Sequence, residues 1–497
     1  MTDHIFDKLL QAAAEQPDAV ALEFMGQRIT YAALAQNARK LASGLRAHGL
    51  QQGQSVGLML PNLPQFAEAL YGAWLNGNVV VPMNVLLKAP EIRYLVGDSK
   101  LQAMFVFDAF LPELEAAIAG MDAPPRIIVV GKPGPHTPYG ALLETRPPDG
   151  ARSASPDEHV LTIYTSGTTG KPKGAVITNR NVLAQLDMTD DLFPPVEGDK
   201  TLCVLPLFHV FALNGVLNAA IRARGTVVLH PKFDVDAAAK ALQHDGISVF
   251  CGVPTMYFYL LKHPDIASMR FPQLRYCVSG GAAMPIDVMR SFEDRFGVPI
   301  YEGYGLTETT VSVCCNRAGA KKVGSVGKPY PAVQLMIADD EGNPVPTGQR
   351  GEILVKGPNL MQGYLDRPDA TAEAIVDGWF HTGDIGYVDD EGFVFIVDRK
   401  KDMIIKGGYN IYPREIEEVL YQLPQVAEAA VVGVRDQAKG EQVRAVISVR
   451  PGSELTSDQV HEHLRDNLAK YKLPSEYVFM NELPKGPTGK ILKRELH

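Results

Sequence analysis

Short apolar runs recur along the chain and alternate with stretches that show helical periodicity. Two segments rich in proline and glycine, Pro124–Gly134 and Pro147–Pro156, are predicted to be loops. Alternating strands and helices are typical of a layered α/β architecture, which we take as the fold class. The clearest strand candidates are Thr226–Leu229, Ser248–Gly252, Tyr276–Ser279, Glu352–Lys356 and Phe393–Asp398.

A charged run, Asp398–Asp402, separates the last of these strands from the glycine pair Gly407 and Gly408. Such a run is usually only a solvated turn. A chain of 497 residues is too long for one ordinary core, so at least two domains are expected. We place the boundary in this run, with a large multi-layer α/β domain over residues 1–400 and a small α+β domain over residues 401–497.

The pattern beyond the boundary predicts a compact α+β module. Pro413 suits the first turn of a helix, and apolar residues follow it at helical spacing. Residues 429–434 and 444–449 are predicted strands. A capping box at Thr456 and Gln459 begins a further helix. Its apolar face is formed by Val460, Leu464, Leu468 and Tyr471.

Composition limits the class of protein. The chain is 46% hydrophobic and 21% charged, with a net charge of −9, which argues against nucleic acid as the main partner. It shows no basic segment leading into an apolar run at the N-terminus, as a secretory signal would, and no apolar run of the ~18 residues that a membrane span needs. The five cysteines show no zinc-like spacing, so we expect free thiols and a cytoplasmic location.

The segment Leu161–Gly174 carries the most informative chemistry. An apolar strand leads into a loop with four hydroxyls, three glycines and two lysines, which can supply the donors that a polyphosphate needs. Gly167 and Gly170 are too close together for a Walker A loop, and Pro172 follows the lysine. A flexible linker would not normally follow a buried strand. The predicted phosphate-binding residues are Thr165, Ser166, Gly167, Thr168, Thr169, Gly170 and Lys171.

This loop resembles the phosphate-binding signature of the adenylate-forming superfamily, which includes acyl-CoA synthetases, adenylation domains of peptide synthetases and luciferases. The likeness covers essentially the whole chain, because further family motifs follow in the correct order. They are Leu205–His209, Tyr304–Thr309, Thr382–Asp384, Asp398–Asp402 and Pro487–Lys490. The resemblance implies an ATP-dependent acid–CoA ligase that forms an acyl-adenylate and then a thioester, with ATP, Mg²⁺ and coenzyme A as cofactors and cosubstrates.

The resemblance also assigns roles in nucleotide binding. Tyr304 offers an aromatic face to adenine, Thr307 a hydroxyl to the α-phosphate, and Glu308 a carboxylate to Mg²⁺. Alone, this string would fit a plain turn into a helix. Asp384 is expected to hold the two ribose hydroxyls, with Arg399 also touching the ribose. The adenine is expected to lie along Gly281, Ala282 and Ala283.

The C-terminal domain is implied to be mobile, because one site cannot serve both half-reactions at once. Lys401 matches the family hinge. Lys490 matches the lysine that bridges the carboxylate and the α-phosphate during adenylation, a charge that must arrive and then leave. For thioester formation, Lys406, Gly407 and Gly408 match the segment that the pantetheine arm passes.

His209 has two interpretations. A lone histidine beside apolar residues is more often a packed core residue, whereas the resemblance gives it a place in the catalytic site that orients the acid's carboxylate without transferring a proton. The predicted acyl pocket comprises Val210, Phe211, Asn214, Gly252 and Val253. No Lys or Arg occurs among residues 204–218, so a second carboxylate on the substrate is not favoured.

The chain looks most like bacterial medium- to long-chain fatty acid–CoA ligases. Aryl or hydroxycinnamic acid–CoA ligases share every catalytic motif and remain an alternative, as does an enzyme that loads a carrier protein. A luciferase-type oxidase and a non-catalytic nucleotide-binding regulator are further alternatives. The joint presence of Lys490, Glu308 and Asp384 argues against the regulator. We expect small-molecule partners only, and either a monomer or a homodimer.

Overall fold

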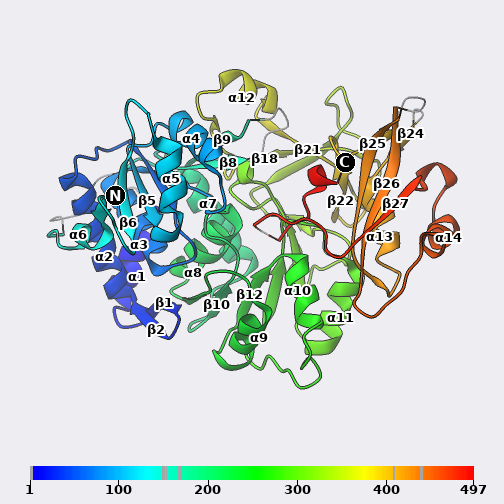
Figure 1. The fold of residues 1–497 in the computed structure, drawn as a ribbon, viewed down its shortest axis with the longest axis horizontal. Coiled ribbons are helices and arrows are strands. Elements are labelled where there is room, and N and C mark those ends of the chain that lie inside the picture. The colour runs from blue at the N-terminus through cyan, green and yellow to red at the C-terminus, as the bar shows by residue number, and fades with distance from the viewer. Residues whose placement is uncertain are drawn as a thin grey trace.

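The protein has a large N-terminal part and a small C-terminal part, which Figure 1 shows running from blue to red. The predicted α/β architecture with a small second domain is therefore confirmed. The structure is a computed structural model, and the residues that it describes are 4–147, 152, 154–165, 171–406, 409–436, 440–487 and 489–496.

Two largely parallel sheets form the core of the large part. The first has the order β16-β15-β14-β13-β12-β10-β11-β1-β2. In that order its strands are Lys328–Pro329, Cys314–Cys315, Ile300–Tyr304, Tyr276–Ser279, Val249–Gly252, Lys200–Cys203, Thr226–Leu229, Val20–Phe24 and Gln27–Thr30. The second has the order β19-β9-β8-β4-β3-β5-β6-β7. Its strands are Gly363–Tyr364, Lys173–Thr178, His159–Thr165, Val79–Pro82, Ser55–Met59, Ala103–Phe107, Arg126–Val130 and Thr137–Pro138.

Helices cover these sheets, and α3 (Pro64–Asn76) is buried at every residue except Gln65. A helix that is apolar on all sides belongs in a core. The Trp74 indole donates a hydrogen bond to the carbonyl oxygen of Val160 at 2.9 Å and so ties α3 to the second sheet. The other helices here are α1 (Ile5–Glu15), α2 (Tyr31–Ala47), α4 (Ala89–Asp98), α5 (Leu111–Ile118), α6 (Tyr139–Leu143), α7 (Asn179–Leu192), α8 (Ala219–Arg222), α9 (Val235–His244), α10 (Pro254–Leu261) and α11 (Ile286–Phe296).

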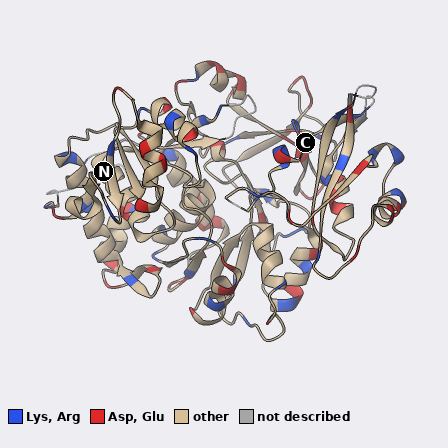
Figure 2. Cartoon of the chain, in the orientation of Figure 1, with Lys and Arg blue, Asp and Glu red and all other residues tan. Residues whose placement is uncertain are grey.

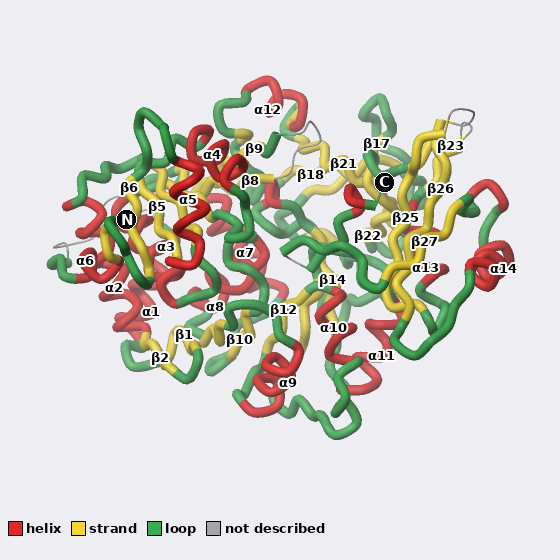
Figure 3. Tube along the Cα trace, in the orientation of Figure 1, coloured by secondary structure: helices red, strands yellow, loops and turns green. Residues whose placement is uncertain are grey.

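Two further sheets lie toward the C-terminus. The third contains β17 (Gln334–Ala338), β18 (Gly351–Lys356), β20 (Ile375–Val376), β21 (Trp379–Val388) and β22 (Val394–Arg399), with α12 (Pro368–Ala374) nearby. The fourth, at the right of Figure 3, contains β23 (Ile404–Lys406), β24 (Tyr409–Ile411), β25 (Val426–Asp436), β26 (Gly440–Val449) and β27 (Glu476–Met480). Helices α13 (Pro413–Leu420) and α14 (Ser457–Asn467) belong to this small part.

All five strand candidates named above are confirmed to within one residue at each end. The capping box of Thr456 and Gln459 is also present at the start of α14. The predicted loop Pro124–Gly134 was wrong, because Arg126–Val130 forms β6 beside β5. A run of apolar β-branched residues there outweighs the flanking prolines and glycines.

The helices differ from a plain α-helical pattern in two places. Helix α14 ends at Asn467, so Leu468 is extended and Tyr471 lies in the short 3₁₀ turn Lys470–Lys472. The helix that begins at Phe211 is a π-helix, η2 (Phe211–Asn218), and it continues directly into α8. π-Helical segments are rare and often lie at functional sites.

The chain passes from β22 to β23 through a turn at residues 400–402. The large and small parts are as expected, while the boundary between residues 400 and 401 stays a prediction. Basic and acidic residues are interspersed along the outer helices and loops (Figure 2). All five cysteines are free and buried. Within the described ranges, no helix has both the length and the apolar character needed to cross a bilayer.

Candidate active site

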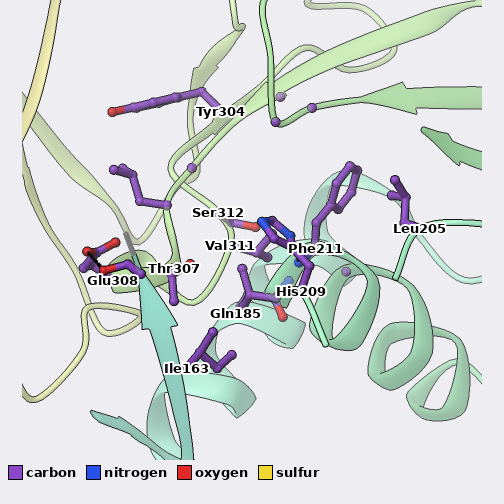
Figure 4. Close-up of a pocket in the computed structure, with 18 of the residues that line it drawn as sticks. Ile163, Gln185, Leu205, His209, Phe211, Tyr304, Thr307, Glu308, Val311 and Ser312 are labelled. Atoms are coloured by element: carbon purple, nitrogen blue, oxygen red, sulfur yellow. Dashed lines mark hydrogen bonds between the residues drawn. The ribbon is translucent and has the colours of Figure 1, made fainter. Parts of the chain in front are cut away.

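A continuous cavity of about 1110 Å³ is lined by residues of the large part, of β21 and β22, and of the C-terminal segment. In the view of Figure 4, Thr307 and Glu308 lie on one side of it and His209 and Phe211 on the other. The cavity brings together many residues that are far apart in the sequence. Those predicted above that line it are Thr165, His209, Val210, Phe211, Val253, Gly281, Tyr304, Thr307, Glu308, Arg399, Lys401 and Lys490.

Asp384 lies at the edge of this site, next to the lining residue Gly383. Strand pairing sets it directly opposite Arg399, and its Oδ1 lies 3.0 Å from the Arg399 Nε atom. The Tyr304 hydroxyl donates to Oδ2 at 2.5 Å. Asp384 is 2% exposed, so the guanidinium and the hydroxyl compensate a carboxylate that would otherwise be costly to bury. Each carboxylate oxygen keeps a lone pair that could accept a ligand hydroxyl.

Glu308 forms one corner of this site, where β8 and β9 meet. Thr165 ends β8 opposite Lys173, which begins β9. One oxygen of Glu308, Oε1, accepts hydrogen bonds from the Tyr364 hydroxyl at 2.9 Å and from the Thr165 hydroxyl at 3.4 Å. The arrangement brings a carboxylate, a hydroxyl and a lysine to the two ends of the predicted phosphate loop.

Lys490 reaches the cavity from the C-terminal segment. The residue is exposed to solvent in part, but protein surrounds its ammonium group. The resulting desolvation, together with repulsion from Arg399, lowers the pKa of Lys490 to about 8. The preceding Gly489 has a φ of +79°, and a Cβ there would lie 3.1 Å from both Val253 and Thr255. Glycine is therefore required for the close approach of this segment to α10.

His209 lies close enough to Lys490 to be affected by its charge. Burial first, and then the ammonium of Lys490, lower the pKa of His209 to about 4. The backbone N–H of Phe211 donates to its Nδ1 atom at 3.3 Å. The ring is therefore neutral at physiological pH, which suits orientation of a ligand better than proton transfer.

The cavity continues past His209 into an apolar region. The Phe211 ring lies between Gly215 and Gly280, where added Cβ atoms would come within 3.1 and 3.3 Å of it. Beyond the ring, the walls come from η2, α8 and the first sheet. They include Val216, Ala219, Ala220, Ala223, Val249, Cys251 and Tyr276.

Some predicted residues do not line this cavity. Asn214 is fully buried in η2, where its side-chain oxygen accepts a hydrogen bond from Asn218 at 2.8 Å. The Lys406 ammonium donates to the carbonyl oxygen of Leu473 at 3.1 Å. Also absent from the lining are Lys171, Gly252, Ala282, Ala283 and Asp384, although a sequence neighbour of each except Ala283 contributes. Ser166, Gly167, Thr168, Thr169, Gly170, Gly407 and Gly408 lie outside the described residues.

The sequence interpretation missed two contributors. Tyr364 contacts Glu308 from 56 positions away, and Gln185 of α7 is a fully buried residue of the cavity wall. Neither belongs to a recognisable motif. Only the antiparallel pairing of β19 with β9 brings Tyr364 to the site.

Comparisons with known proteins identify the family of this chain. The model of the AMP-binding enzyme family matches residues 9–365, and that of the AMP-binding enzyme C-terminal domain matches residues 415–490. A long-chain-fatty-acid–CoA ligase of Bacillus subtilis is 36% identical over 98% of this chain and 93% of its own length. A feruloyl-CoA synthase of an Amycolatopsis species is 39% identical over 98% of this chain and 97% of its own.

Solved structures show the same relationship. ATP-bound MatB from Rhodopseudomonas palustris superposes with a TM-score of 0.93 at 30% identity, covering 100% of this chain and 98% of its own. The anthranilate CoA ligase AuaEII in complex with anthranoyl-AMP also gives 0.93, at 27% identity and with 99% and 96% coverage. The chain belongs to the AMP-binding enzyme family and is an AMP-forming acyl-CoA synthetase, an acid–thiol ligase that uses ATP and CoA.

Proposed function

We propose that this ligase activates medium- to long-chain fatty acids. The observation that carries the proposal is the extension of the cavity beyond Phe211, where Val216, Ala219, Ala220, Ala223 and Val249 form part of the wall. The similarity to the B. subtilis long-chain-fatty-acid–CoA ligase supports it. Each buried methylene contributes about 0.8 kcal/mol, so chain-length preference should be graded.

Adenylation joins two anions, and the residues around the cavity supply the positive charge and alignment that this requires. Lys490 would bridge the acid's carboxylate and the α-phosphate, while Thr307 would donate to that phosphate. The neutral His209 would orient the carboxylate. Asp384 and Arg399 would fix the ribose, and the Lys490 charge would offset repulsion as the carboxylate approaches phosphorus.

The carboxylate at Glu308 suits a Mg²⁺ ion that also binds phosphate. No group of three or more His, Cys, Asp or Glu residues in the described part of the chain could hold a metal by itself. Mg²⁺ usually needs only one or two protein carboxylates beside substrate phosphates, so this donor set fits the ion. When bound, it would neutralise phosphate charge and favour departure of pyrophosphate.

Thioester formation requires other groups near the same carbonyl, so the small domain, residues 401–497, would rotate about Lys401. The present arrangement, with Lys490 at the cavity, corresponds to the adenylation state. In support, the TM-score is 0.93 against ATP-bound MatB and 0.82 against apo MatB. The segment Lys406–Gly408 would then face the pantetheine arm.

Two related activities have their own support. The feruloyl-CoA synthase at 39% identity favours an aryl or hydroxycinnamic acid, for which the Phe211 ring offers a stacking surface. A fatty acid–[acyl-carrier-protein] ligase of Streptomyces coeruleorubidus at 36% identity favours a carrier protein as the acyl acceptor.

A pyrophosphate-release panel tests these alternatives. Acids from acetate to palmitate, together with benzoate and coumarate, are supplied with and without CoA. The proposal expects release to peak among aliphatic acids of medium or long chain and acyl-CoA to accumulate when CoA is present. A peak on coumarate would indicate that the substrate is a hydroxycinnamic acid and not a fatty acid. Activation without any CoA thioester would point to the carrier protein.

A further inference from the structure

The carboxylate of Glu308 is held through only one of its two oxygens. The Tyr364 hydroxyl and the Thr165 hydroxyl both donate to Oε1, at 2.9 and 3.4 Å. Among the described residues, no donor reaches Oε2. Glu308 is 8% exposed and lines the cavity, so its second oxygen is left for a ligand.

Tyr364 is itself firmly placed. It belongs to β19 and pairs with Ala175 of β9, and its backbone N–H donates to the Thr371 hydroxyl at 2.8 Å. The Lys173 ammonium lies 4.5 Å from the centre of its ring.

The same short segment also fixes the backbone of Glu308. The carbonyl oxygen of Glu308 accepts a hydrogen bond from the N–H of Met361 at 2.8 Å. The segment 361–364 therefore holds this residue at both its main chain and its side chain. It also pairs with β9, so this strand and the Glu308 carboxylate are held in one unit.

We propose that Tyr364 is a positioning residue that sets the divalent-metal affinity of the site by orienting Glu308 so that Oε2 faces the nucleotide phosphates. The inference rests on the proposed role of Glu308 as the metal carboxylate. Without the Tyr364 hydroxyl, only the Thr165 hydroxyl at 3.4 Å would hold that carboxylate, which could then turn Oε2 away from the metal. Outer partners of metal ligands commonly affect metal affinity by about 10- to 100-fold.

The test measures metal binding directly. Mn²⁺ is titrated into the full chain in the presence of α,β-methylene-ATP, and free Mn²⁺ is followed by electron paramagnetic resonance. Tyr364→Phe removes the hydroxyl and keeps the ring. We expect it to weaken Mn²⁺ binding by about 10-fold. Binding of the ATP analogue in EDTA should stay unchanged, because the fold and the nucleotide pocket are intact.

Tyr477→Phe is the matched control, because it removes a hydroxyl that lies 2.9 Å from a His461 ring nitrogen in the small part, away from the cavity. It should leave Mn²⁺ affinity unaltered. Unaltered Mn²⁺ affinity in Tyr364→Phe would overturn the proposal. So would an equal loss of analogue binding in EDTA, which would indicate a merely structural role. Glu308→Gln is run in parallel: if that variant binds Mn²⁺ as the wild type does, the metal role of Glu308 fails instead.

Discussion

The Tyr304 hydroxyl donates a hydrogen bond to Oδ2 of Asp384 at 2.5 Å, and this contact ties the first sheet to the third at the predicted ribose position. The bond and the contact with Arg399 fix the orientation of the Asp384 carboxylate at the edge of the cavity. Nucleotide affinity should therefore depend on this carboxylate more than on the tyrosine hydroxyl that supports it.

Asp384→Asn should weaken ATP binding about 10- to 100-fold, because hydrogen bonds to a charged acceptor contribute roughly 1.5–3 kcal/mol. Isothermal titration with ATP measures the loss. Tyr304→Phe is the companion variant and should cost less, since it keeps the charge. Equal ATP affinity in Asp384→Asn and wild type would show that Asp384 does not contribute to ATP binding.

Lys490→Ala should separate the two half-reactions. Acid-dependent pyrophosphate–ATP exchange should fall at least about 100-fold, since the charge that brings the two anions together is lost. Thioester formation from a supplied acyl-adenylate should persist. The exposed Lys470 of the same domain, outside the cavity lining, provides a control in Lys470→Ala. Near-normal exchange in Lys490→Ala would refute the assigned role.

The pH dependence of adenylation should reveal the same lysine. The pKa of Lys490 is lowered to about 8 in the free enzyme. Its side chain therefore carries a positive charge below that pH and loses the charge as the pH rises through it. We expect kcat/KM for ATP to decline above this value. Lys490→Arg keeps its charge throughout and should lack that decline. A wild-type profile that stays flat well into the alkaline range would contradict the assignment.

Chain-length preference should respond to the wall of the apolar extension. Gly215 lies against the Phe211 ring, so Gly215→Leu would fill the cavity just beyond it. We expect selectivity for octanoate over palmitate to rise about 10-fold or more, since excluding even two methylenes loses about 1.6 kcal/mol. The measurement is kcat/KM across a series of acids, with KM for ATP as the internal control. An unchanged profile would show that acids bind elsewhere.

Glu302 should make stability depend on pH. It is 1% exposed, its Oε2 atom has no hydrogen-bond partner, and burial raises its pKa to about 7. The pKa of Glu302 in the folded state lies above its value in the unfolded state. As the pH rises between these two pKa values, Glu302 therefore lowers the free energy of unfolding progressively. Glu302→Gln should therefore raise Tm more at alkaline than at acidic pH. An equal gain at both would exclude ionisation as the cause.

Much of the fold follows from local pattern. Strands such as Tyr276–Ser279 and the capped helix at Thr456 were predicted because apolar runs and capping residues act within a few positions. Strand β6 was missed because its neighbours are prolines and glycines, and only its pairing with β5 reveals it. The π-helical form of η2 likewise depends on packing, which periodicity does not show.

The site was predictable where motifs carry it. Thr307, Glu308, Arg399 and Lys490 each belong to a family motif, and all four line one cavity. Tyr364 was missed, because a contact with Glu308 from a separate strand leaves no trace in spacing. The inward extent of the acyl cavity was also hidden, since it depends on how η2 packs against the first sheet.

The contact between Gly489 and α10 bears on how the enzyme cycles. The segment that carries Lys490 touches α10 through Gly489 and two hydrogen bonds. The Thr255 hydroxyl donates to the Gly489 carbonyl oxygen at 3.4 Å, and the Lys485 ammonium donates to the Tyr259 hydroxyl at 2.9 Å. One such bond contributes about 1 kcal/mol net, a few-fold in population. The segment can therefore release from α10 at a small cost in free energy, and the bound nucleotide would help to decide how long Lys490 stays at the cavity.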